Sequence, residues 1–359
     1  MSAITIYDVA REAGVSPSTV SNLLNGRTER MQPTTRARVE AAILRLNYSP
    51  SRAARQLRSG GIHTIGLIVP SVSNPFWGSF ATHFEGSALR RGFGVLLCNS
   101  GRDAARERAY LEELLNDGIS NVVLGSSLPS VKHLRPLIKR GLRVVMLDRS
   151  GQEGDPTGLF GVSVDNASGA RAIAEHFWEA GHRRFAFISG ELDSVSRRER
   201  LTGFTEALTR HGVDSDDIVI RRGRERAGDI DVSLADVGRQ AAYEILSSSG
   251  RRVTAIATVN DLCAIGVYRG IRDAGLEVGR DVAVAGFDDI PLAQIIQPTL
   301  TTVHQPLDRM SEIALTRLLG IPGPEDGEGV PTTIEAQMVV RESSMSFEPA
   351  VAISGGATR

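Results

Sequence analysis

After residue 63 the sequence alternates short apolar runs with longer amphipathic stretches, and this alternation constrains the fold more than any other feature. Apolar runs of this length are typical of buried strands, whereas the stretches at 170–180 and 201–211 have helical spacing. Strands that alternate with helices form parallel sheets covered by helices. The strand-like runs are Thr64–Val69, Gly94–Cys98, Asn121–Gly125 and Arg143–Leu147, then Arg184–Ser189, Val253–Thr258 and Val282–Phe287. Two sets of strands, interrupted near residue 160, predict two similar α/β lobes.

Residues 5–47 have a different pattern, that of three short helices. Thr5 and Asp8 have the spacing of a capping box, and Gly14 suits the end of the first helix. Ser16 and Pro17 suit the N-cap and first position of a second helix. A third helix is predicted from about residue 33 to residue 47. Two helices joined by a short turn that contains glycine form a helix-turn-helix.

The second helix of this pair carries short polar side chains on its outer face. Side chains of this kind can reach base edges in the major groove of DNA. The outward residues are Pro17, Ser18, Ser21 and Asn22.

The charge distribution supports a polyanion partner for this N-terminal part. Residues 1–60 hold nine arginines and four acidic residues, a net charge of +5, and the remainder holds 32 basic and 38 acidic residues, a net charge of −6. A basic head on a mildly acidic body is typical of a nucleic-acid-binding module.

Several classes of protein are disfavoured by what the sequence lacks. Two cysteines, Cys98 and Cys263, cannot form a disulfide framework, and the seven histidines are scattered without metal-ligand spacing. No Gly-x-Ser-x-Gly elbow and no Walker loop is present. We therefore expect no enzyme activity, no cofactor and no metal. No apolar run is long enough for a membrane helix, and the N-terminus lacks an export signal, so we expect a cytoplasmic protein at the nucleoid.

The segment 5–26, TIYDVAREAGVSPSTVSNLLNG, strongly resembles the head of the lactose/galactose repressor family. Residues 35–39 and 46–50 resemble the same family, and the likeness extends to about residue 342. It implies an all-α helix-turn-helix head joined to a two-lobed α/β sensor that resembles periplasmic sugar-binding proteins. It also implies a homodimer on a double-stranded, pseudo-palindromic operator and a small-molecule effector, most simply a sugar.

The resemblance also assigns DNA contacts. Residues 51–58 correspond to the hinge helix of the family, in which Ala54 and Leu57 enter the minor groove and the paired Leu57 side chains of a dimer wedge open the central base step. Position 22 departs from many members, which carry arginine there, because Asn22 is better matched to adenine. The expected DNA-binding residues are Thr5, Tyr7, Pro17, Ser18, Thr19, Ser21, Asn22, Asn25, Tyr48, Arg52, Ala54 and Leu57.

In the sensor, polar residues that follow strands are the expected ligand contacts, because ligands of open α/β sheets bind beyond the carboxyl ends of the strands. The segments 194–204, 258–266 and 284–289 resemble those in which the family places its effector-binding arginine, asparagine and aspartate. We interpret Arg200 and Asp261 as structural. The expected effector-binding residues are Ser71, Phe76, Asp148, Arg198, Asn260, Asp288 and Gln305.

The predicted organisation is a helix-turn-helix domain at 1–50, a hinge helix and linker at 51–61, and an effector-binding and dimerisation domain at 62–342. Within that domain the first lobe is expected to comprise 62–161 and 291–320, and the second lobe 162–290 and 321–342. Residues 343–359 show no periodicity and are expected to form a flexible tail.

Three alternatives stay open from the sequence. The cleft could serve a protein partner, or a nucleoside or purine corepressor, in place of a sugar. An exported sugar-binding protein for transport is the third alternative, and the DNA-binding head argues against it.

Overall fold

The structure is a computed structural model of the chain. It describes residues 4–24, 27–29, 31–48, 63–126, 128–149, 151–226, 230–248, 253–321 and 332–345. The chain divides between His63 and Thr64 into two compact units, each with its own hydrophobic core.

The N-terminal unit contains the three predicted helices, α1 (Ile6–Ala13), α2 (Pro17–Leu24) and α3 (Pro33–Arg45). At the start of α1 the Asp8 carboxylate accepts hydrogen bonds from the Thr5 backbone N–H at 2.9 Å and from the Thr5 hydroxyl at 2.7 Å. At its end Gly14 adopts the left-handed conformation, with a φ of 64°. One small core joins the three helices, and its buried members are Val9, Ala10, Ala13, Val20, Val39, Ala42 and Tyr48.

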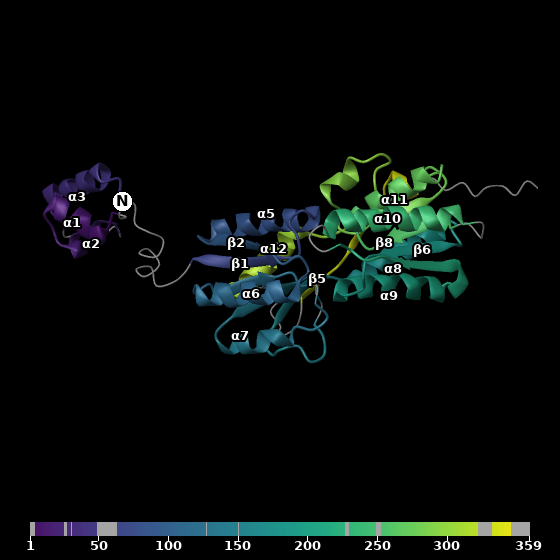
Figure 1. Cartoon of the computed structure of the whole chain (residues 1–359), viewed down its shortest axis with the longest axis horizontal. Coiled ribbons are helices and arrows are strands. Elements are labelled where there is room, and N and C mark those ends of the chain that lie inside the picture. Colours follow the sequence, from purple (N-terminus) through teal and green to yellow (C-terminus); the bar gives the residue numbers. More distant parts are fainter. Residues whose placement is uncertain are drawn as a thin grey trace, which may run out of the picture. The chain divides into compact units, whose positions relative to one another are not determined.

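The first lobe of the C-terminal unit is built on a six-stranded parallel sheet with the spatial order β11-β5-β4-β3-β1-β2. Helices α5 (Pro75–Arg90) and α12 (Leu307–Leu319) pack against one face, and α6 (Ala104–Asn116) packs on the other beside η1 (Lys132–Leu134) and α7 (Arg135–Lys139) (Figure 1). The strands are β1 (Thr64–Val69), β2 (Gly94–Asn99), β3 (Asn121–Leu124), β4 (Arg143–Leu147), β5 (Phe160–Val164) and β11 (Thr332–Ile334).

The second lobe repeats this plan with four parallel strands in the order β7-β6-β8-β9. Helices α8 (Asn166–Glu179) and α9 (Val195–Arg210) cover one face, and α10 (Ile230–Ser247) and α11 (Asp261–Asp273) cover the other (Figure 1). The strands are β6 (Phe185–Ser189), β7 (Ile218–Arg222), β8 (Ala255–Thr258) and β9 (Ala283–Ala285), and the 3₁₀ turns are η2 (Ser215–Asp217) and η3 (Pro291–Gln294).

The chain crosses between the lobes after β5, at β10 (Thr302–His304) and after β11. Strand β10 pairs antiparallel with β12 (Gln337–Val339), which precedes η4 (Glu342–Ser344). These crossings place the carboxyl ends of the strands of both lobes at the boundary between them. No helix among the described residues is long and apolar enough to span a bilayer.

The helix-turn-helix head and the two α/β lobes agree with the sequence prediction, but the lobe boundaries need correction. Strand β5 extends the first lobe to residue 164, and β11 joins the same sheet because residues 332–334 pair in parallel with 162–164. The interval 321–342 therefore does not belong wholly to the second lobe. The interval 291–320 does not belong wholly to the first lobe either, because residue 301 still bridges to β9 in the second lobe. Strand β7 was not predicted.

The predicted tail begins too early. Ser343 and Ser344 are buried, and the Ser343 hydroxyl donates to the Val284 carbonyl at 2.7 Å. The Ser343 side chain thus ties η4 to the end of the second sheet. Residues 346–359 lie outside the described residues.

Candidate functional site

Helix α2 is held by its apolar side and presents its polar side to solvent. Ser16 caps the helix, because its hydroxyl accepts from the Thr19 backbone N–H at 3.2 Å. Val20 is fully buried against the other two helices, whereas Ser18 and Asn22 are exposed. The exposed face therefore consists of small hydrogen-bonding groups on a firmly packed helix, as recognition of DNA base edges requires.

The other predicted DNA-binding residues differ in placement. Thr5 and Tyr7 are exposed at the start of α1, and Pro17, Thr19 and Ser21 are partly buried on α2. The Tyr48 side chain is 9% exposed and packs in the core of the head, and its contact with DNA stays a prediction. The predicted contacts that lie outside the described residues are Asn25, Arg52, Ala54 and Leu57.

A cleft between the two lobes of the sensor contains most of the predicted effector site. The empty space within it is about 450 Å³ when the part open to solvent is included. Both lobes contribute to its wall. The lining residues are Pro70, Asn74, Phe76, Trp77, Arg102, Ser126 and Asp148 from the first lobe and Ser194, Ser196, Arg197, Arg200, Val259, Asn260 and Asp288 from the second.

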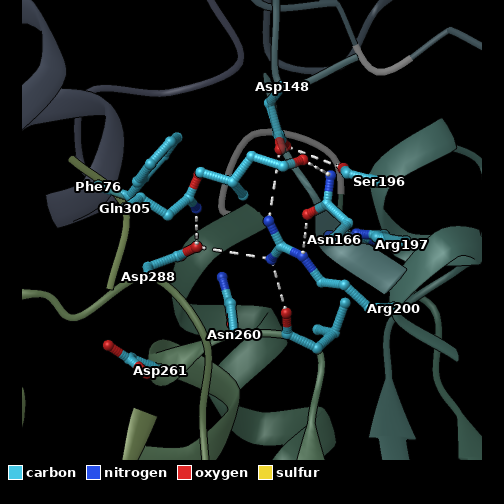
Figure 2. Close-up of polar contacts among 12 residues, drawn as sticks. Phe76, Asp148, Asn166, Ser196, Arg197, Arg200, Asn260, Asp261, Asp288 and Gln305 are labelled. Carbon is cyan, nitrogen blue, oxygen red and sulfur yellow. Dashed lines mark hydrogen bonds and ion pairs between the residues drawn. The ribbon is translucent and has the colours of Figure 1, made fainter. Parts of the chain in front are cut away.

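Arg200 lies at the centre of this cleft, between two carboxylates (Figure 2). One guanidinium nitrogen is 3.5 Å from Asp288 and another is 3.4 Å from Asp148. Two shorter bonds fix the group, from Nε to the Asn166 side-chain oxygen and from Nη1 to the Val259 carbonyl, both 2.8 Å. The guanidinium also stacks 3.8 Å from the Phe287 ring centre. The cation is thus held rigidly while its contacts to the two carboxylates stay long.

Asp148 joins the two lobes. It follows β4 in the first lobe, and its carboxylate accepts from the Ser196 hydroxyl of α9 at 2.8 Å in addition to its contact with Arg200. Both Asp148 and Asp288 have positive φ angles, of 52° and 121°. Such conformations are unusual for residues other than glycine and occur preferentially at functional sites.

Burial raises the pKa of Asp288 to about 7, since the positive charge of Arg200 only partly offsets the loss of water. The negative charge of Asp148 raises this pKa further, and the hydrogen bond from Gln305 opposes the rise. A carboxyl group with this pKa is poised to change its protonation near neutral pH when a ligand replaces its surroundings.

Two amide side chains lie near Asp288, and of these only Asn260 lines the cleft. Asn260 caps α11, because its side-chain oxygen accepts from Cys263 N at 3.0 Å, and its amide nitrogen points toward Asp288 and Arg200 (Figure 2). Gln305 donates to Asp288 at 2.8 Å, while its own side-chain oxygen is buried without a hydrogen-bond partner. Asn260 and the Phe76 ring offer polar groups and an apolar surface within one cavity, and Gln305 acts on that cavity through its bond to Asp288.

Three predicted effector contacts do not line the cleft, namely Ser71, Arg198 and Gln305, and of these Gln305 still bonds to Asp288 in its wall. Ser71 accepts a hydrogen bond from Ser73 N at 3.2 Å, and it does not line the cavity. Arg198 donates to the Leu192 carbonyl at 3.1 Å and likewise lies outside the lining. The physical reason is helical phase, since Arg197 and Arg200 are three residues apart on the buried face of α9 and Arg198 is about 100° away from Arg197. The central arginine is Arg200, which the sequence analysis interpreted as structural.

Ser196, Trp77 and a charged cluster around Arg197 also belong to the cleft, although they were not among the expected effector-binding residues. There Arg197 donates to Glu225 at 2.6 Å and to the Glu191 carbonyl at 2.8 Å. Arg102 of the first lobe lies 4.0 Å from Asp193 of the second. The spacing of Arg197 and Arg200 with Gly203 and Phe204 was the available signal for the inward face of α9.

A second acidic cluster lies beside the cleft, where the chain crosses between the lobes. We call it the crossover cluster, and its members are Asp261, Asp289, Thr302, His304 and Arg341. Asp261 accepts from the Thr302 hydroxyl at 2.6 Å and from Ile290 N at 2.9 Å. Asp289 accepts from Arg341 at 2.6 Å and lies 2.9 Å from His304 Nδ1. Burial raises the pKa of Asp261, and the nearby charge of Asp288 raises it further.

Two family profiles match this chain. Residues 5–51 match the profile described as bacterial regulatory proteins, lacI family, and residues 174–344 match that of a periplasmic binding protein-like domain. The first match covers the helix-turn-helix head, and the second covers most of the second lobe, the two later crossings, and α12 and β11 of the first lobe.

Relatives and solved structures match most of the chain. The ribose operon repressor of Escherichia coli strain K12 is 37% identical over 321 residues, which cover 88% of this chain and 92% of the relative. Among solved structures, the lac repressor dimer bound to operator and the anti-inducer ONPF has a TM-score of 0.79 at 27% identity, covering 96% of this chain and 100% of that one. A regulator from Enterococcus faecium with bound ribose has a TM-score of 0.67 at 27% identity, covering 78% and 98%.

Proposed function

Because this chain belongs to the lacI family of bacterial regulatory proteins, we propose that it is a transcriptional repressor whose affinity for operator DNA is controlled by a sugar bound between the lobes of its sensor. The observation that carries this proposal is the position of Arg200 between Asp148 and Asp288 in a cleft that both lobes line. A ligand that contacts all three side chains would change how the lobes are held together.

The head recognises DNA through α2. Ser18 and Asn22 are exposed on a helix anchored by Val20, and an asparagine side chain pairs well with the major-groove edge of adenine. Residues 51–58, which lie outside the described residues, are proposed to follow α3 as the hinge, with Arg52, Ala54 and Leu57 at the minor groove. We expect the protein to act in the cytoplasm, at the nucleoid.

The protein is proposed to act as a homodimer, as the operator-bound lac repressor does. Strand β2 is an edge strand of the first sheet, and it leaves Leu96 and Leu97 45% and 40% exposed. Leu89 on the adjoining α5 is 64% exposed. An unpaired edge with exposed leucines is a surface that a second copy can cover. Two copies would present two α2 helices to a palindromic site.

The chemistry of the cleft fits a polyol. Asp148 and Asp288 can accept hydrogen bonds from neighbouring hydroxyls, and Arg200 can donate to the same ligand. Phe76 supplies a surface for the apolar face of a sugar ring. The ribose operon repressor and the ribose-bound regulator among the relatives support a sugar over a purine or a protein partner.

Fluorescence anisotropy tests this proposal with labelled DNA from upstream of the gene that encodes the protein. The wild-type chain is titrated onto this DNA and then challenged with a panel of pentoses and hexoses. We expect tight binding that weakens steeply with salt and is altered by one sugar. Binding that no sugar alters would contradict the sugar effector, and equal binding to unrelated DNA would contradict the operator.

A further inference from the structure

Trp77 lines the cleft from the first lobe, and the end of β3 lies directly behind it. The indole is 6% exposed and packs edge-on against Phe76, with ring centres 4.9 Å apart, and against Phe80, with ring centres 6.4 Å apart. Ser126, the residue after Gly125, also lines the cleft. The indole is therefore a fixed part of the cleft wall, and Gly125 forms its backing.

Gly125 leaves no room for a side chain. A Cβ atom built on it would lie 2.4 Å from Cη2 and 2.6 Å from Cζ3 of Trp77, far inside van der Waals contact. The backbone at this point is tied to β1, because Gly125 N donates to the Ile68 carbonyl at 2.8 Å. Gly125 does not have a positive φ, so the backbone conformation does not require glycine. Glycine is required at this position because a Cβ atom would collide with the indole of Trp77.

We propose that the Trp77–Gly125 pair sets the depth of the cleft on the side of the first lobe and thereby selects a pentose ring over sugars with an exocyclic carbon. The absence of a side chain at Gly125 lets the indole sit back against β3. The bulk of the same indole limits how far a ligand can extend toward the sheet. This inference rests on the proposed function, since it concerns the size of the sugar in the same cleft.

Substitutions at Trp77 and at Gly125 should have opposite effects on the depth of the cleft. Trp77→Phe removes the outer ring of the indole and deepens the cleft. Gly125→Ala pushes the indole forward into the ligand space. The atoms nearest the added methyl group belong to that outer ring, so Trp77→Phe should relieve the clash in the double variant. A rescue of this kind requires direct contact between the two residues.

Isothermal titration calorimetry with D-ribose and D-allose tests the pair. The pyranose forms of these sugars share the same hydroxyl configuration and differ by one hydroxymethyl group. We expect Trp77→Phe to raise the affinity for allose relative to ribose about tenfold, the usual scale for a single carbon in a shaped pocket. We expect Gly125→Ala to weaken ribose binding at least about tenfold, and the double variant to recover most of that loss.

Gly66→Ala is the matched control. A Cβ at Gly66 would lie 2.7 Å from a Leu114 methyl group, between β1 and α6, and Gly66 does not line the cleft. It should lower the melting temperature and leave the ribose-to-allose ratio unchanged. The inference would be overturned if Trp77→Phe left the ribose-to-allose affinity ratio unchanged, or if the double variant bound ribose no more tightly than Gly125→Ala. In either case, ribose binding by the wild type would still uphold the proposed function. Failure of the wild type to bind any sugar would overturn both.

Discussion

Asp288 and Asp289 are neighbours in the chain and both are largely buried beside an arginine, yet the distances to that arginine differ. In the crossover cluster the contacts of Asp289 with Arg341 and His304 are 2.6 and 2.9 Å long. In the cleft, Asp288 and Asp148 are 3.5 and 3.4 Å from the guanidinium of Arg200. Short, saturated contacts hold a fold in one geometry. Longer contacts between strained, buried groups leave hydrogen-bonding capacity that a ligand can use.

The comparison suggests how a two-lobed sensor separates stability from response. The crossover cluster fixes the segments through which the chain passes from lobe to lobe, and it does not line the cavity. In the cleft, Asp148 of the first lobe directly contacts Ser196 and Arg200 of the second lobe. A ligand can therefore alter the second set of contacts while the first set stays intact.

Of the substitutions considered, one that disrupts the crossover cluster should have the largest effect. The quantity it lowers is the free energy of unfolding. Asp289→Ala leaves Arg341 without its carboxylate partner, and removing one member of a largely buried ion pair costs about 3 kcal/mol. Urea unfolding of the sensor should show this loss. Glu112→Ala, which removes an exposed pair with Arg108 on α6, should change the free energy of unfolding little. Equal effects of the two variants would contradict the structural role of the crossover cluster.

Removing Arg200 should affect ligand binding more than any other single change in the cleft. Arg200→Ala leaves both carboxylates without their shared cation, and we expect sugar affinity to fall about 100-fold, or about 3 kcal/mol. Arg198→Ala is the matched control on the same helix, and its affinity should stay within about threefold of the wild type. Calorimetry distinguishes the two. A larger loss of sugar affinity in Arg198→Ala than in Arg200→Ala would support Arg198 as the effector-binding arginine, as the sequence suggested.

The raised pKa of Asp288 predicts pH dependence in two quantities. The folded-state pKa of about 7 exceeds the ordinary value of 3.8, so the folded protein binds the proton more tightly than the unfolded chain. The contribution of Asp288 to stability should therefore fall as pH rises from about 4 to about 7. A sugar that donates to the ionised carboxylate should bind about tenfold more tightly at pH 8 than at pH 6, with proton release.

Asp288→Asn is the control for this titration. Its affinity is expected to be weaker and nearly flat between pH 6 and pH 8, as measured by calorimetry in buffers of different ionisation enthalpy. A wild-type affinity that is also flat would show that Asp288 does not change protonation when the sugar binds.

The smallest effect should come from Ser196. Ser196→Ala removes the 2.8 Å hydrogen bond to Asp148 and leaves Arg200 in place. A single hydrogen bond contributes about 1 kcal/mol net, which corresponds to a change of about threefold to tenfold in affinity. Ser215→Ala, on the exposed η2 turn, is the control and should behave as the wild type in the same titration. A Ser196→Ala effect as large as that of Arg200→Ala would contradict a central role for the arginine.

Local patterns explain most of what the sequence predicts correctly. The helices of the head follow from caps and apolar spacing, and the core strands follow from continuous apolar runs. Strand β7 escaped prediction because its last residues, Arg221 and Arg222, are charged and exposed at the sheet edge. Strand β11 escaped because its partner, β5, lies far away in the sequence.

In the cleft, too, local patterns predict some residues correctly, and contacts between residues distant in sequence escape prediction. Asp148, Asn260 and Asp288 follow strands of parallel sheets, so their convergence is predictable from topology. The choice between Arg198 and Arg200 depends on the phase of one helix, and the resemblance alone placed it two residues early. The pKa of Asp288 depends on Arg200, Asp148 and Gln305, which are distant in sequence and meet only in the folded protein.

The most direct test of the central claim is the operator response of Arg200→Ala, measured by anisotropy with the same labelled DNA and the sugar that acts on the wild type. We expect this variant to bind the operator as tightly as the wild type. The sugar, which should shift the operator affinity of the wild type by about 5-fold to 150-fold, should have no effect on the variant at the same concentration. A variant that binds the operator and responds to the sugar as the wild type does would show that the cleft around Arg200 is not the site that controls DNA binding.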